Sequence, residues 1–321
     1  QIKKCILDER IKNRKLNKKK NYFIKKNILS RILIFHKILY KLKNNSYLLC
    51  FNNLPPLLKQ NCRVILFVQS IFFFSNISNL NLNLYTTFRI IFEKIWFRLG
   101  ISNVDEIWVQ TPAMEKKLKK YLSEINFKKK IIIKVLLLSD KKLLNIFNSK
   151  KKFQKKNNAK NSFFYPADGL GHKNHDKLIK AFSEIKKPFK LYLTLDDQIF
   201  SNLICQKKIK IKENFINLKT LKREEVFDVY KNKIDVLIFP SFDESFGIPL
   251  LEACAFNKFI LVSNKNYAHD LIENAVLFDP KNVISIKKAI NKYINNKIKI
   301  KPNIKKNLKL LSAEQFINNI N

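Results

Sequence analysis

The chain has 321 residues, 46% of them hydrophobic, which is enough for two domains with separate cores and excludes a mainly disordered protein. The 63 Lys and Arg residues against 25 Asp and Glu residues give a formal net charge of +38, which favours nucleic acid or an anionic membrane surface as a partner. The lysine excess is, however, spread evenly along the chain. An even excess is a poor indicator of a nucleic-acid site, so we expect no specific nucleic-acid partner.

The cysteines and the apolar runs bear on the compartment. Five scattered cysteines, with no pair at metal-ligand spacing, indicate reduced thiols of an intracellular protein. No segment reaches the roughly 18–20 apolar residues of a transmembrane helix. We therefore expect a cytoplasmic protein. The chain begins at Gln1 with no visible signal peptide, and an incomplete start, which would hide one, stays an alternative.

The N-terminal half alternates short strands with longer helices. Residues 1–29 have weak periodicity, and 30–42 have the pattern of an amphipathic helix that packs on a core or lies on a membrane. Strands are predicted at 47–51, 63–68, 106–109 and 131–138. Helices are predicted at 84–99, with one apolar face, and from Pro112 to 122, with Thr111 as the N-cap. The alternation predicts an open parallel sheet.

The C-terminal half repeats this alternation after a polar, lysine-rich stretch at 149–161, which we interpret as a linker. Strands are predicted at 162–165, 189–195, 215–218, 236–239, 259–262 and 276–280. Helices are predicted at 175–186, 223–231, 248–255, 269–272, 283–294 and 312–320. We therefore predict an α/β protein of two doubly wound, Rossmann-type domains, 1–155 and 156–321, that face a cleft. Ligands of such sheets bind outside the carboxyl ends of the strands.

Glycine is rare, and its positions point to two loops of the second domain. Of four glycines, Gly169 and Gly171 lie in one loop and Gly247 in another, and both loops run from a predicted strand to a predicted helix. A missing Cβ lets backbone amides approach a ligand, and free N–H groups at a helix start attract anions. Both loops are therefore candidate anion sites.

Charged residues accompany both loops. Lys173 lies in the first loop near the helix start, Glu244 lies in the second, and Glu252 lies about a turn into the next helix. A cation and free amides suit a diphosphate, while a carboxylate suits ribose hydroxyls, so the two loops together predict a nucleotide site. Plain strand-to-helix connections are one alternative. A glycoside hydrolase would also use two carboxylates, about 5–10 Å apart, but the glycine at a helix start favours a nucleotide-linked sugar. The pair Asp196 and Asp197 follows a strand and is predicted to be a turn rather than a metal site.

Residues 244–252, ESFGIPLLE, carry two glutamates separated by seven residues and follow the sequence FPS at 239–241. This pattern resembles the signature of retaining GT-B glycosyltransferases of the group 1 or family 4-like type. The sequence HKNH at 172–175 is similar to the other donor-side loop of that family. The resemblance covers about 160–300, and more weakly 105–118.

The resemblance implies a role for each matching residue. Glu252 is implied to hold the ribose, Lys173 to neutralise the leaving diphosphate, and Glu244 to contact the donor sugar. The implied donor-binding residues are Gly171, His172, Lys173, Glu244, Ser245, Phe246, Gly247, Ile248 and Glu252, of which Glu244 and Lys173 are implied to be catalytic. The implied reaction needs no metal and no cofactor. The implied partners are a UDP- or GDP-linked sugar and a glycan or lipid-linked acceptor of cell-surface glycan or lipopolysaccharide-type synthesis, at the inner face of a membrane.

Two departures from the family pattern leave alternatives open. Family members often carry an arginine five residues before the lysine, where this chain has Asp168. The first strand and glycine-rich turn of the N-terminal domain are not recognisable, so that domain is truncated or divergent. A degenerate, non-catalytic GT-B protein and a basic nucleic-acid-binding protein are the alternative interpretations. None of the four histidines is predicted to be a catalytic base.

Overall fold

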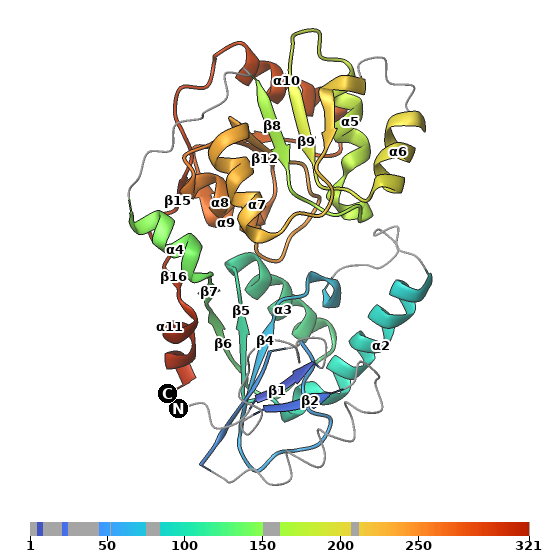
Figure 1. The fold of residues 1–321 in the computed structure, drawn as a ribbon. Helices are drawn as coiled ribbons and strands as arrows, with labels where there is room; N and C mark the ends of the chain where they lie inside the picture. Colours follow the sequence, from blue (N-terminus) through green and yellow to red (C-terminus); the bar gives the residue numbers. More distant parts are fainter. Residues whose placement is uncertain are drawn as a thin grey trace.

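The computed structural model in Figure 1 describes residues 5–8, 21–24, 45–51, 53–74, 84–149, 161–206 and 212–320. The predicted helix at 30–42 and all but the two ends of the predicted linker at 149–161 lie outside these residues. The limits of the two domains therefore stay a prediction.

The first half of the described chain is built on a parallel sheet with the strand order β3-β4-β5-β6. Its strands are β3 (Tyr47–Cys50), β4 (Arg63–Val68), β5 (Glu106–Val109) and β6 (Ile132–Val135), and a separate parallel pair joins β1 (Cys5–Asp8) to β2 (Asn21–Ile24). The helical segments are η2 (Ile71–Phe73), α2 (Leu84–Gly100), η4 (Ile101–Asn103) and α3 (Pro112–Glu124). The Thr111 side chain accepts the N–H of Met114, which confirms the predicted cap of α3.

The second half is built on a parallel sheet with the order β10-β9-β8-β11-β12-β14. Its strands are β8 (Ser162–Tyr165), β9 (Lys190–Leu193), β10 (Phe215–Asn217), β11 (Val236–Phe239), β12 (Phe259–Ser263) and β14 (Val276–Phe278). The connecting segments are η5 (Gly171–Lys173), α5 (His175–Ser183), α6 (Asp197–Gln206), η6 (Lys212–Asn214), α7 (Arg223–Asp228), η7 (Val229–Lys233), α8 (Ile248–Ala255), α9 (Asn266–Leu271) and α10 (Val283–Ile294). Helices α5, α6 and α10 cover one face of the sheet, and α7, α8 and α9 the other (Figure 1). This is the doubly wound α/β arrangement that the sequence predicts.

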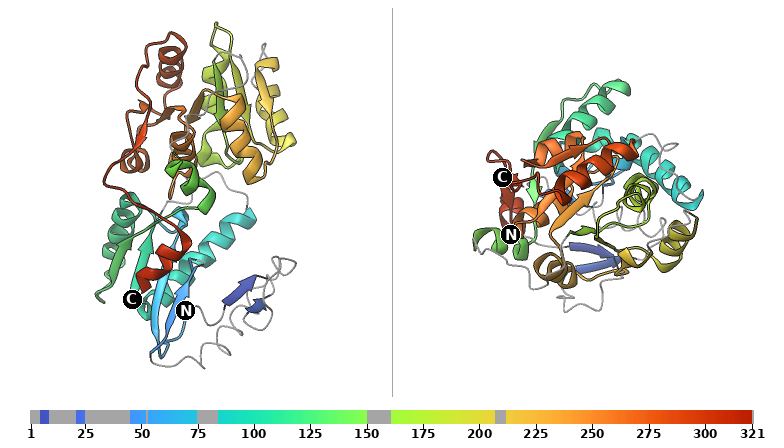
Figure 2. Two further views of the ribbon diagram at one scale, coloured as in Figure 1. Left: turned by 60° about the vertical axis from the view of Figure 1, so that its left-hand side comes forward. Right: turned by 90° about the horizontal axis from the view of Figure 1, so that it is seen from above.

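The C-terminal residues return to the N-terminal sheet. Strand β16 (Leu310–Leu311) pairs in parallel with β7 (Leu137–Leu138), and Figure 2 shows α11 (Ala313–Ile317) against the first half of the chain. Phe316 is 1% exposed and packs edge-on against Phe67 and Trp108. The remaining short elements are α4 (Lys141–Asn148), β13 (Ile272–Glu273), β15 (Asn303–Ile304) and η8 (Asn318–Ile320). Residues 310–320 thus pack with the first sheet, although the predicted second domain includes them.

Asparagine takes many of the backbone positions that glycine fills in other proteins. Gly247 has φ +78°, whereas Asn126, Asn257 and Asn296, which follow the C-caps of α3, α8 and α10, have φ of 52°, 55° and 56°. Asparagine is the residue that follows glycine in tolerance of this left-handed conformation. Helices of this chain can therefore end in the usual way although glycine is scarce. Gly247 is a position where the left-handed conformation is taken by glycine rather than asparagine.

Three predicted elements need correction. The single strand predicted at 131–138 is divided into β6 and β7, which belong to different sheets. Asp196 and Asp197 were predicted to form a turn, but Asp197 opens helix α6 and the Asp196 carboxylate accepts the N–H of Gln198. Helix α2 was predicted to have one apolar face. It buries Ile90 and Phe97, of which Phe97 belongs to the core on the first sheet, yet it also exposes a second apolar face.

Candidate functional site

The two predicted loops meet where the winding direction of the second sheet reverses. From β8 the chain proceeds outward through β9 to β10, and it then returns to β11, on the other side of β8. Loops that follow the two strands beside such a reversal diverge and leave a site at the carboxyl ends. The loop after β8 contains Lys173 and the loop after β11 contains Glu244. The topology of the sheet, independently of any motif, therefore favours a ligand site between these loops.

The loop after β8 is held in place by Asn174. Asn174 is buried with φ +62°, and its side-chain amide donates to the carbonyls of Pro240 (3.1 Å) and Pro280 (2.8 Å). These carbonyls follow β11 and β14, so one side chain joins three strand ends. The carbonyl of His172 also accepts the N–H of Phe242 (2.8 Å). The short helix Gly171–Lys173 is thereby fixed against the second loop.

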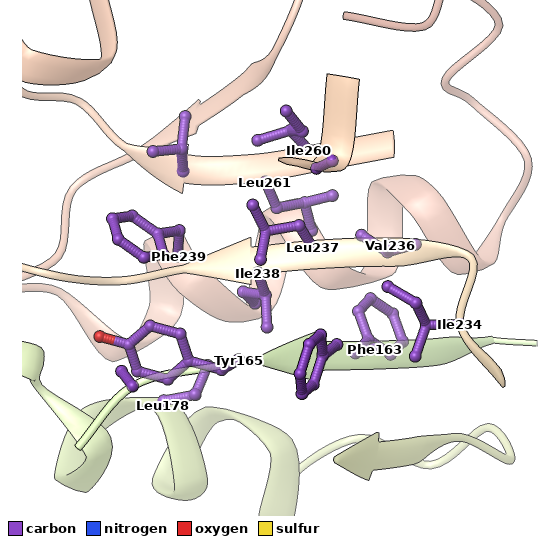
Figure 3. Packing of buried hydrophobic residues seen from close by; sticks show 14 of the residues in the cluster. Phe163, Tyr165, Leu178, Ile234, Val236, Leu237, Ile238, Phe239, Ile260 and Leu261 are labelled. Carbon is purple, nitrogen blue, oxygen red and sulfur yellow. The ribbon is translucent and has the colours of Figure 1, made fainter. Parts of the chain in front are cut away.

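Lys173 and Glu244 form an ion pair across the two loops. The Nζ of Lys173 lies 2.7 Å from Oε1 of Glu244, and their side chains are 16% and 11% exposed. Below them Tyr165 donates its hydroxyl proton to the carbonyl of Lys173 (2.8 Å) and lies 2.8 Å from Oγ of Ser241. Figure 3 shows the Tyr165 ring at the end of β8, with its hydroxyl directed past the strand. Burial, and to a smaller extent the Glu244 charge, raises the pKa of Tyr165, so it stays a neutral hydrogen-bonding group.

The second loop ends at the left-handed Gly247, directly before Ile248 opens α8. A Cβ at Gly247 would lie 3.2 Å from Cδ1 of Leu250, in a conformation that side chains rarely adopt. Phe246 is buried, and Ile248 is 43% exposed. The loop therefore presents the first amides of α8 toward the carboxyl ends of the strands, as an anion site requires.

Glu252 is paired within the protein. Its side chain is 2% exposed, and Oε1 forms a close ion pair with Nη1 of Arg223 at the start of α7. The other arm of Arg223 binds Oδ2 of Asp140 at 2.6 Å. Among the described residues, Arg223 is the arginine that contacts a predicted donor residue, and it binds Glu252 rather than compensating for Asp168. The role implied for Glu252 stays a prediction.

Two buried histidines lie beside this site. Burial, aided by the Lys173 charge, lowers the pKa of His172 to about 4 and that of His175 to about 3. Nδ1 of His172 and Nε2 of His175 have no hydrogen-bond partner. His175 lies against the Tyr165 ring, with centroids 4.8 Å apart, and the His172 ring meets Phe72 of η2 edge-on at 5.8 Å. Both are neutral groups near neutral pH, and the prediction that neither is a catalytic base stays a prediction.

Helix α3 joins the first half of the chain to the second loop. Thr111 donates to the carbonyl of Ser245 (3.1 Å), the N–H of Ala113 donates to Oδ2 of Asp270 (2.5 Å), and Lys117 forms an ion pair with Asp243. Burial raises the pKa of Asp270, and the hydrogen bond from the Ala113 N–H offsets part of this increase. The predicted site residues Glu244, Ser245 and Phe246 therefore lie in a loop that the first half of the chain contacts directly.

Cavities and metal sites give no further support to the predicted site. One surface cavity is lined by Asn61, Cys62, Arg63, Asp105, Lys130 and Ile132, and a second by Lys180, Glu184, Asp279 and Lys281–Ile284. Neither lining includes a predicted donor residue. In the described ranges, no three His, Cys, Asp or Glu side chains are placed to hold a metal ion.

The model of the glycosyl transferases group 1 family matches residues 147–310, just over half of the chain. The chain belongs to this family. The O-antigen chain mannosyltransferase RfbU of Salmonella typhimurium is 27% identical over 164 residues, which are 50% of this chain and 46% of RfbU. The matched region contains both loops and every predicted donor residue.

Solved structures of GT-B enzymes share the fold of this group 1 chain. TarM aligns with a TM-score of 0.57 and 13% identity over 83% of this chain and 51% of TarM. An α,α-trehalose-phosphate synthase (UDP-forming) from Burkholderia vietnamiensis aligns with a TM-score of 0.59 and 9% identity over 83% of this chain and 72% of that one. The predicted GT-B fold is confirmed. The chain spans about half the length of RfbU and of TarM.

The sequence did not reveal every residue that shapes this site. Asn174 stood in the quoted HKNH motif without an assigned role, although an asparagine directly before a helix and after a short turn is a signal for the left-handed conformation. Arg223 lies 29 residues before Glu252 and Asp140 lies 83 residues before Arg223, so their contacts leave no local pattern in the sequence.

Proposed function

We propose that this group 1 glycosyltransferase moves a sugar from a nucleoside diphosphate donor, UDP- or GDP-linked, to a glycan or lipid-linked acceptor. The observation that carries the proposal is the Lys173–Glu244 pair of 2.7 Å between the two loops at the reversal point of the sheet. It brings the cation of one loop to the carboxylate of the other, as a donor with both a diphosphate and a sugar needs. The name of the B. vietnamiensis relative describes a UDP-forming enzyme, which supports a donor of this class.

In this proposal the reaction proceeds through electrostatic stabilisation of the leaving diphosphate. Lys173 and the first amides of α8 are placed to bind negative charge that develops as the sugar–phosphate bond breaks, and Glu244 is placed to bind sugar hydroxyls. These groups can do so without a metal ion, so we propose a metal-independent reaction. The resemblance of residues 244–252 to retaining enzymes leads us to propose retention at the anomeric carbon.

The proposed class of product is based on the similarity to RfbU. RfbU is named an O-antigen chain mannosyltransferase, and the matched half of this chain is the half that carries the donor loops. We therefore propose a role in cell-surface glycan or lipopolysaccharide-type synthesis, on the cytoplasmic side of a membrane.

Incubation with a panel of UDP- and GDP-sugars tests this function. We expect release of UDP or GDP from at least one donor without added metal, undiminished by EDTA. Proton NMR of the transferred or released sugar should show the donor's anomeric configuration first. Inversion would contradict retention, and loss of activity in EDTA would contradict the metal-independent reaction. The variant Lys173→Met should lose turnover, whereas Lys187→Met, on the surface of the same domain, should not.

We also propose that the chain attaches to an anionic membrane through the outer face of α2. In the described part of the chain, no helix is long and apolar enough to span a bilayer. Leu84, Phe88, Ile95 and Leu99 recur on one side of α2 and are 79%, 69%, 54% and 64% exposed. Arg89 and Arg98 lie on the same helix, and the net charge of +38 suits anionic lipid.

Flotation with liposomes tests this attachment. The wild type should float with vesicles that contain about one third phosphatidylglycerol and stay behind with neutral vesicles, and added salt should weaken the binding. The double variant Phe88→Ser/Ile95→Ser should lose flotation. The control Ile284→Ser changes an equally exposed side chain on α10, and it should float normally. Equal flotation of the two variants would contradict the proposal.

A further inference from the structure

Arg223 lies at the centre of a three-residue network that reaches Glu252 from outside the predicted motif. Its Nη1 contacts Oε1 of Glu252, and its Nη2 lies 2.6 Å from Oδ2 of Asp140. The guanidinium also lies over the ring of Phe227, 4.5 Å from the centroid. Two carboxylates and a ring therefore fix the plane of the guanidinium and with it the position of Oε1.

The network supplies a cation to a buried carboxylate. At 2% exposure, Glu252 is almost fully removed from water, and an ionised carboxylate in such a place requires a bound cation. Within the described residues, Arg223 is the cation that forms an ion pair with it. Without Arg223 the carboxylate would take up a proton or turn away, and in either case it would lose acceptor capacity.

The pairing leaves part of the Glu252 carboxylate available. A carboxylate can accept about four hydrogen bonds, and the recorded contacts from described residues reach Oε1. Arg223 itself is 35% exposed. The two vicinal hydroxyls of a ribose are donors that fit such an ionised, oriented acceptor.

The same network reaches the segment that leads out of the first half of the chain. Asp140 is the N-cap of α4, and its Oδ1 accepts the N–H of Leu143 at 2.8 Å. The backbone N–H of the preceding Ser139 donates to the carbonyl of Leu311, next to the β7–β16 pair. A second ion pair, Lys142 with Glu224, joins α4 to α7 without contact to Glu252. That second pair is a matched control for any purely structural effect of joining the two helices.

We propose that Arg223 is the positioning residue for ribose recognition, because it holds Glu252 ionised and aimed at the ribose hydroxyls. The inference rests on the proposed nucleotide-sugar function and assigns to Arg223 a role outside the motif. Arginine is needed for its fork geometry, since a lysine reaches one carboxylate as a point charge and cannot bridge Asp140 and Glu252 in the same way.

Calorimetry with UDP, GDP and their 2′-deoxy analogues tests the proposal through the ribose-to-deoxyribose affinity ratio. The wild type should prefer the better ribonucleotide over its 2′-deoxy form by about tenfold or more, as expected for a hydrogen bond to a charged group. Arg223→Met should reduce this ratio to near one by weakening ribonucleotide binding. Arg223→Lys should give an intermediate ratio, and Asp140→Asn, which retains a capping side chain for α4, a smaller reduction.

The controls separate this role from a structural one and from failure of the proposed function. Lys142→Ala should keep the wild-type ratio. If Arg223→Met does not fold, Arg223→Lys and Asp140→Asn test the inference instead, since both are expected to lower the affinity ratio by graded amounts. An unchanged ratio in the Arg223 variants, or tighter ribonucleotide binding by them, would overturn the inference. Equal binding of the ribonucleotide and its 2′-deoxy form by the wild type would also overturn the inference, while nucleotide binding itself would remain. A wild type that binds neither UDP nor GDP would instead overturn the proposed function.

Discussion

Nζ of Lys173 and Oε1 of Glu244 lie 2.7 Å apart, so each of the two predicted catalytic side chains neutralises the charge of the other. An incoming diphosphate competes for the lysine, and sugar hydroxyls can then bind the carboxylate. Removal of one partner leaves the other charge largely buried, which costs about 1–3 kcal/mol or more. We expect Lys173→Met and Glu244→Gln each to lower thermal stability by several degrees.

The double variant Lys173→Met/Glu244→Gln separates stability from function. It removes both charges together, so its melting temperature should recover toward that of the wild type, because no unpaired charge remains. Its turnover should stay at the level of Lys173→Met, roughly a hundredfold or more below the wild type, since the leaving-group cation is absent. Recovered turnover would show that Lys173 has no catalytic role.

Gly247 provides a test of the loop conformation. Because its φ is +78° and a Cβ would crowd Leu250, Gly247→Ala should reduce the free energy of unfolding by about 1–2 kcal/mol. Gly247→Asn should cost less, as asparagine adopts a similar φ at positions 126, 257 and 296. Urea denaturation of both variants measures this difference, and equal losses would contradict a conformational cause.

Because the C-terminal residues pack on the first sheet, we expect the free energy of unfolding to depend strongly on Phe316. Its ring lies 4.8 Å from Phe67 and 5.0 Å from Trp108, so Phe316→Ala should cost about 3–5 kcal/mol of unfolding free energy. Phe316→Leu should cost less, because it leaves a smaller cavity. Fluorescence of Trp108 should shift to longer wavelength in the alanine variant, and an unshifted spectrum would place the helix elsewhere.

The buried histidines predict loss of stability in acid. Their pKa values, about 4 for His172 and about 3 for His175, lie below the unfolded value of about 6.5. Between these values the unfolded chain binds protons that the folded chain does not. The stabilisation is therefore complete above about pH 6.5 and falls as the pH drops toward 4, by up to about 1.4 kcal/mol per pH unit for each histidine.

Unfolding free energies from pH 7.5 to 5 measure this dependence. The variant His175→Phe should reduce the slope in this range, since it removes one of the two groups. The control His269→Gln changes an exposed histidine and should leave the slope as in the wild type. A slope that does not respond to His175→Phe would assign the acid sensitivity to other groups.

The sequence predicted the strands and helices of the second half well, because each combined an apolar period with a clear end signal. Val236–Phe239 and Ile248–Ala255 lie where their apolar residues, glycine and proline place them. Helix α6 was missed because the acids that cap and open it are also turn formers. The packing of Phe316 on Trp108 and the contact of Arg223 with Glu252 join distant residues, and local periodicity carries no record of such contacts. The sequence thus located the two loops, while their ion pairs needed the fold.

Binding of UDP and GDP to the folded wild type and to Glu252→Ala, measured by isothermal titration calorimetry, tests the central claim most directly. We predict saturable binding of at least one of the two nucleotides by the wild type, and at least tenfold weaker binding by Glu252→Ala, about 1.4 kcal/mol. Circular dichroism serves as the check that both proteins are folded. A folded wild type that binds neither nucleotide would contradict the assignment of these loops to a nucleotide-sugar donor.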